Sequence, residues 1–148
     1  LQSLPLEPWQ PLLAKLKIHW ILTLIPTLIC GILSMFVLPF TVAERILILL
    51  LPLTYGIFSG MLGLSLGLKF PSLTWVNETA PIKQSASVTI ALFGGWGYSI
   101  IIGGLYFLVR TFLSAIVYLV LSLALTAALS ALLYTWLRKR GTKIFASL

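Results

Sequence analysis

The sequence predicts an all-α polytopic membrane protein with four transmembrane helices and an N-terminal amphipathic interfacial helix. Of its 148 residues, 59% are hydrophobic and only 9% are charged, whereas soluble domains carry about a quarter charged residues. The apolar residues fall into four blocks, each long enough for the roughly 20 residues that a membrane-spanning helix needs. Helices are expected rather than open strands, because backbone polar groups in hydrocarbon must be satisfied internally.

The predicted organisation has three parts. They are a cytoplasmic amphipathic segment at residues 1–17, a transmembrane domain at residues 18–137 and a basic cytoplasmic tail at residues 138–148. Within the transmembrane domain, we expect helices at about 18–40, 46–68, 87–109 and 112–137, with a cytoplasmic loop at 69–86. The chain is therefore expected to form two helical hairpins joined by this central loop.

The first segment is predicted to lie at the membrane surface, because it is too short to span. Its prolines permit a helix only from about Pro8 onwards, since proline is tolerated in a first helical turn but not in the interior. From there Leu12, Leu13 and Leu16 share one face, and Lys15 points away from it.

Basic residues predict the orientation of the chain in the membrane. The side with both termini and the central loop holds Lys15, Lys17, Lys69, Lys83, Arg138, Lys139, Arg140 and Lys143, and the other side holds Arg45 and Arg110. Cytoplasmic loops are enriched in lysine and arginine, so both termini and the loop are expected in the cytoplasm. The net charge of +7 is concentrated beside the apolar blocks. That placement favours anionic lipids as partners over nucleic acid.

Closely spaced glycines mark two of the predicted helices. Small residues four positions apart let a neighbouring helix approach closely, and glycine-rich stretches can bend. We interpret these positions as packing or hinge sites: Gly56, Gly60, Gly63, Gly67, Gly94, Gly95 and Gly97. In the last helix, Ser122, Thr126 and Ser130 recur every four residues, and several alanines lie among them. This small-residue surface predicts that the last helix packs against protein over much of its length.

Residues for catalysis are scarce. The chain has one histidine, one cysteine and no aspartate, so ordinary metal sites and a serine–histidine pair are not expected. No charged residue lies at the centre of a predicted span, where ion-coupled carriers usually place an acid. We therefore predict that the protein is not an enzyme and holds no metal or cofactor. Any transport would take its energy from elsewhere.

Two segments resemble motifs of permeases in type-2 ABC exporters. Ser3-Leu4-Pro5-Leu6, then Leu12-Leu13-Ala14-Lys15 and an apolar helix, is similar to a turn and a short amphipathic helix that precede a membrane helix in that family. The central loop resembles a signature of one bacterial branch, through Lys69-Phe70-Pro71, Trp75, Asn77-Glu78 and Lys83-Gln84. The family often has an aspartate just before the lysine, where this chain has Gly67-Leu68.

The resemblance implies six helices per permease half, of which this chain would hold the last four. It also implies a bacterial inner (plasma) membrane, a separate ATP-binding-cassette ATPase subunit, and a second permease half or a homodimer. The expected ATPase contacts are Leu4, Pro5, Leu12 and Lys15, and the residues expected to shape the inner loop are Pro71, Trp75, Glu78, Lys83 and Gln84. Alternatively, the first segment lies on lipid, Trp75 anchors at the interface, and Lys69 and Lys83 only enforce topology.

The function expected from these features is the membrane-spanning permease part of an ABC exporter. The ATP would be hydrolysed by the separate subunit. The alternative is a non-catalytic transmembrane helix bundle that serves as an assembly or scaffold partner in a membrane complex.

Overall fold

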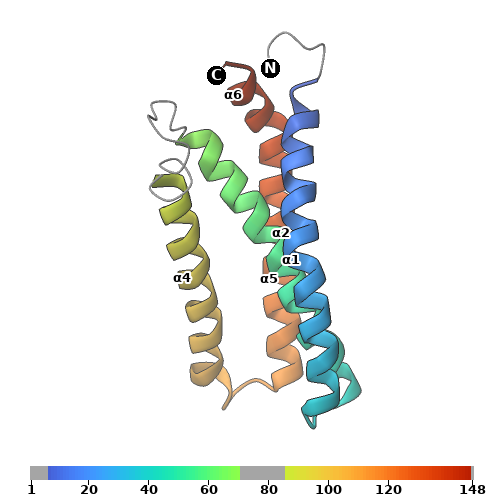
Figure 1. Ribbon diagram of the computed structural model, residues 1–148. Helices are drawn as coiled ribbons and strands as arrows, with labels where there is room; N and C mark the ends of the chain where they lie inside the picture. The colour runs from blue at the N-terminus through green and yellow to red at the C-terminus, as the bar shows by residue number, and fades with distance from the viewer. Residues whose placement is uncertain (1–6, 71–85, 148) are drawn as a thin grey trace.

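The structure, a computed structural model, describes residues 7–70 and 86–147, and every regular element in those ranges is helical (Figure 1). The elements are α1 (Trp9–Val37), α2 (Val42–Lys69), α4 (Ala86–Val109), α5 (Ala115–Trp136), the π-helical turn η1 (Leu137–Gly141) and α6 (Thr142–Ser147). Four helical stretches of the described chain are long and apolar enough to cross a membrane. The predicted all-α, polytopic fold class is confirmed.

The spanning helices alternate in direction along the chain (Figure 1). The start of α1, the end of α2, the start of α4 and the short helix α6 all lie at one end of the bundle. We call this the basic end, because its described cations are Lys15, Lys17, Lys69, Arg138, Lys139, Arg140 and Lys143. The opposite end carries Arg45 and Arg110. The unequal division of basic residues therefore corresponds to two physical ends of the molecule.

Helix α2 is the centre of the bundle. Its largest interface is with α5, followed by those with α1 and α4. In Figure 1, α1, α2 and α5 lie close together, whereas α4 stands to one side. The share of α4's apolar span that is buried is zero, against 22% for α2. Helix α4 is therefore the least enclosed of the four.

The first helix differs from the prediction of a short interfacial helix followed by a separate span. Helix α1 runs without a break from Trp9 to Val37, so the amphipathic segment is the first part of the spanning helix. Leu12 and Leu16 are buried and Lys15 is exposed, as the amphipathic pattern predicts. The helix continues because no proline lies between Pro11 and Pro26 to interrupt its hydrogen bonds.

The second spanning helix begins at Val42, four residues before the predicted start at residue 46. A capping box explains the earlier start. The Thr41 side chain accepts a hydrogen bond from the Glu44 backbone N–H, and the Glu44 carboxylate accepts one from the Thr41 N–H at 2.9 Å. Together these bonds satisfy two backbone donors that a helix start leaves free. Helix α5 begins similarly, with Ser114 as its N-cap.

The residues predicted as a basic tail continue the last helix. After Trp136 the backbone widens into the π-helical turn η1 and then returns to α-helix up to Ser147. Within this turn Leu137 and Gly141 are buried, while Arg138, Lys139 and Arg140 are exposed. Leu137 and Gly141, four positions apart, thus share the face toward α2, and the cations between them lie outside.

Candidate functional site: the basic end and the interhelical cavities

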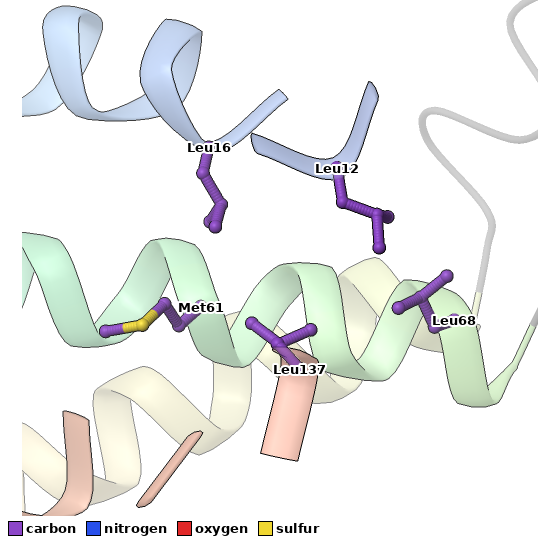
Figure 2. Packing of buried hydrophobic residues seen from close by; sticks show 5 residues of the cluster. All are labelled: Leu12, Leu16, Met61, Leu68 and Leu137. Carbon is purple, nitrogen blue, oxygen red and sulfur yellow. The ribbon is translucent and has the colours of Figure 1, made fainter. Parts of the chain in front are cut away.

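A buried apolar cluster joins three helical elements at the basic end (Figure 2). It consists of Leu12 and Leu16 from α1, Met61 and Leu68 from α2, and Leu137 from η1. Leu12 and Leu137 have no exposed surface, and Leu16 is 1% exposed. Tight packing of this kind transmits displacement, because protein interiors have low compressibility. We refer to these five residues as the basic-end cluster.

Burial changes the interpretation of Leu12. The sequence-based expectation placed it among the contacts to an ATPase, but its side chain packs on α2 and η1. The apolar face of the first segment is therefore covered by the protein's own helices, and the predicted direct role of the Leu12 side chain is not supported. Lys15 is exposed at the edge of that covered face, where it lines an opening between α1 and α2 and a partner could reach it.

Seven of the residues singled out from the sequence lie outside the described ranges. They are Leu4, Pro5, Pro71, Trp75, Glu78, Lys83 and Gln84. The described flanks of the central segment are the end of α2, with Lys69 and Phe70, and the start of α4. Both flanks lie at the basic end of the bundle (Figure 1).

Two of the predicted packing glycines lie where α1 crosses α2. A Cβ at Gly56 would stand 3.1 Å from Leu24 Cδ2. A Cβ at Gly60 would overlap the ring of His19 and stand 3.2 Å from Trp20 Nε1. The Trp20 indole N–H also donates a hydrogen bond to the Ile57 carbonyl at 3.4 Å. Gly56 and Gly60 thus lie where α1 and α2 approach each other closely.

The other glycines behave differently. A Cβ added at Gly63, Gly67, Gly94 or Gly97 would meet no described atom within 4 Å. At Gly95 it would meet only the Tyr55 hydroxyl, at 2.9 Å. Close packing at Gly63, Gly67, Gly94 and Gly97 is thus not found among the described helices. Helix α4 instead contacts α2 through aromatic side chains, among them Tyr98.

A small cavity of about 280 Å³ lies between α2, α4 and α5, roughly midway along them. The rings of Tyr55 and Tyr98 stack at 5.7 Å beside it. The Tyr55 hydroxyl donates to the Gly95 carbonyl at 2.8 Å, and the hydroxyls of Tyr98 and Thr126 are 2.6 Å apart. We call this the tyrosine cavity. Hydroxyls and aromatic faces in an apolar wall are suited to orienting a ligand.

The predicted polar stripe of α5 faces the interior of the helix bundle. Ser122, Thr126 and Ser130 are all buried, and the hydroxyls of Thr126 and Ser130 bond carbonyls one turn earlier. The alanines expected to extend this surface are exposed instead: Ala124, Ala127, Ala128 and Ala131. One narrow face of α5 is therefore packed, because α2 alone covers most of it.

No group of three His, Cys, Asp or Glu side chains in the described ranges could hold a metal ion. His19 Nε2 is buried without a hydrogen-bond partner, beside Gly60, and no acid lies near it in sequence. The sequence analysis missed Tyr55 and Tyr98. Their signal was a polar-tipped aromatic deep inside a span rather than at its edge, where such residues usually lie.

Comparison with known proteins gave no match: no family model, no curated protein and no solved structure is significantly similar to this chain.

Proposed function

We propose that this chain is the membrane-spanning permease part of an ABC exporter, which moves a substrate with ATP hydrolysed by a separate subunit. The observation that carries the proposal is the basic-end cluster. It joins the segment that resembles the family's amphipathic coupling element directly to the end of α2, which leads into the segment that resembles the family's loop signature.

The cluster supplies a route for coupling. A partner that pushed on α1 at the exposed Lys15 would displace the neighbouring Leu12 and Leu16, which lie on the covered face. Those side chains contact the cluster residues of α2 and η1, so all three elements would move together. Rigid-body transmission needs this kind of dry, packed contact, and exposed surface residues would not provide it.

The tyrosine cavity supplies a place for cargo to interact in the middle of the membrane. None of the described residues that line it is charged, so it fits an apolar or amphipathic substrate rather than an ion. Helix α4 closes one side of it and contacts α2 and α5 through Tyr55 and Tyr98. Tyr118 of α5 also donates a hydrogen bond to the Ile102 carbonyl of α4. Movement of α2 at the basic end would therefore change the shape of the cavity.

The second candidate function is a non-catalytic helix bundle that acts as a scaffold in a membrane complex. The uncovered glycines of α4 favour it, because such a face admits another helix at close range. Stable association that does not depend on nucleotide would support this function over the first.

The first experiment is co-purification of the full chain with the ATPase encoded beside it. Lys15→Glu reverses an exposed charge on α1, and we expect it to abolish capture of the ATPase. Arg110→Glu makes the same change at the opposite end and should leave capture intact. Leu12 is left unchanged, because a charge at a fully buried position would disrupt the fold. If the folded, unaltered chain captures no ATPase, the exporter proposal fails and the scaffold proposal replaces it.

A further inference from the structure

A second, larger cavity of about 490 Å³ lies between α2 and α5 on the way to the basic end. Its α2 wall includes Phe58, Ser65 and Lys69, and its α5 wall includes Leu132 and Trp136, with further leucines between them. We call it the α2–α5 groove. Its volume lies within the range of about 300–1,000 Å³ that is typical of ligand sites.

Measured along α2, the groove has about the length of one membrane leaflet. Lys69 follows Phe58 by eleven positions of a continuous helix, or about 16 Å at 1.5 Å per residue. Half of a hydrocarbon core of roughly 30 Å is about the same distance. The groove thus runs from near the middle of the spanning region to the basic end, and most of its lining is apolar.

Its polar features are concentrated where a lipid headgroup would lie. Lys69 is exposed at the end of α2, and Trp136 at the end of α5 is a residue type enriched at headgroup level. The next turn, η1, adds the exposed cations Arg138, Lys139 and Arg140. The only described acid at this end is Glu7, so the local charge is strongly positive.

We propose that the α2–α5 groove binds one anionic phospholipid from the leaflet at the basic end. An acyl chain lies against the leucines of both helices, and the phosphate lies against Lys69. Charge complementarity at one end, with an apolar wall of leaflet length, selects this occupant over an apolar peptide helix. The inference does not depend on the exporter proposal, since it needs only the two helices and their orientation.

The test is native mass spectrometry of the full chain released from detergent with matched phosphatidylglycerol or phosphatidylcholine. We expect the unaltered chain to retain phosphatidylglycerol preferentially. Lys69→Gln should lower that preference about fivefold, as expected for one cation near a headgroup, while Lys69→Arg preserves it. Arg110→Gln removes an exposed cation from the opposite end and should have no effect. Equal losses in Lys69→Gln and Arg110→Gln would reduce the effect to general surface charge and overturn the proposal.

A second pair of variants tests the acyl-chain position. Leu132 lines the groove and is 66% exposed, so Leu132→Trp fills the groove without disturbing the interior. We expect it to lose both lipids, whereas Leu125→Trp, at a 49% exposed site on the same helix, retains them. Unchanged retention in Leu132→Trp would overturn the proposal. A dimer of the unaltered chain that Leu132→Trp separates into monomers would also overturn the proposal, because a second copy of the chain would then occupy the groove.

Discussion

The basic end and the α4 side of the bundle are built from similarly apolar sequence, yet their packing is opposite. At the basic end, leucines from α1, α2 and η1 fill the space between helices, and three of them are almost fully buried. On the other side, large apolar residues of α4 such as Phe93, Trp96 and Ile100 are more than 60% exposed. Hydropathy alone would not distinguish these regions. In a membrane, lipid covers apolar side chains as well as protein does, so burial depends on shape.

The glycines show the same contrast. Gly60 has His19 and Trp20 against it, whereas Gly97 has open space. Both lie in helices with several glycines, and neither has an unusual backbone, since no glycine among the described residues has positive φ. What differs is whether a neighbouring helix supplies a side chain at the right height. The comparison implies that substitutions at the basic end will affect stability and those on α4 will affect attachment or function.

The largest effect is expected at the centre of the basic-end cluster. Leu137→Ala should lower the free energy of unfolding by about 3 kcal/mol, because it leaves a cavity among residues from three elements. Leu132→Ala, at a 66% exposed position earlier in the same helical stretch, should change it by less than about 1 kcal/mol. Titration with a denaturing detergent, followed by circular dichroism, measures both. If the two variants unfold alike, the basic end is no more tightly packed than the lipid-facing surface.

The spans were predictable because their signal is local. Length and hydropathy gave four helices whose described bounds differ from the predicted ones by a few residues, apart from the earlier start of α1 and the continuation of α5 through η1 and α6. The start of α2 moved to Val42 because of the capping box at Thr41 and Glu44, a pattern that can be read from the sequence. The continuity of α1 is different. An amphipathic segment looks the same whether lipid, a partner or the chain's own helices cover its apolar face, and only the fold shows that α2 and η1 do so.

The candidate site was less predictable, because only the fold shows which helix surfaces meet. Spacing identified Gly56 and Gly60, and equally Gly63 and Gly67, but only the first pair meets another helix. The stripe of Ser122, Thr126 and Ser130 was correctly predicted to pack, whereas the alanines around it are exposed. The tyrosine cavity depends on side chains from α2, α4 and α5 meeting at one height, and no spacing within a single helix contains that information.

A paired glycine substitution sharpens the comparison further. Gly60→Ala should destabilise the protein by about 1–2 kcal/mol, because its Cβ would overlap His19 and force the α1–α2 crossing apart. Gly97→Ala should be neutral or stabilising by up to about 1 kcal/mol, since alanine favours helix and meets nothing there. The same detergent titration applies. A large loss from Gly97→Ala would mean that another chain covers this face of α4, which would favour the scaffold proposal.

The smallest effect is expected where α4 attaches. Tyr98→Phe keeps the ring stacked on Tyr55 but removes the hydroxyl that pairs with Thr126. Hydrogen bonds between membrane helices contribute about 0.6 kcal/mol on average, so global unfolding should shift only slightly. The α4 helix should nevertheless open more often, which faster hydrogen exchange of its amides relative to those of α1 would report. Tyr134→Phe, at a 37% exposed ring outside the tyrosine cavity, is the control. If hydrogen exchange in α4 stays unchanged in Tyr98→Phe, the stacked rings hold α4 without help from the hydroxyl. The weaker attachment of α4 then follows from its few backbone contacts with neighbouring helices rather than from its hydrogen bonds.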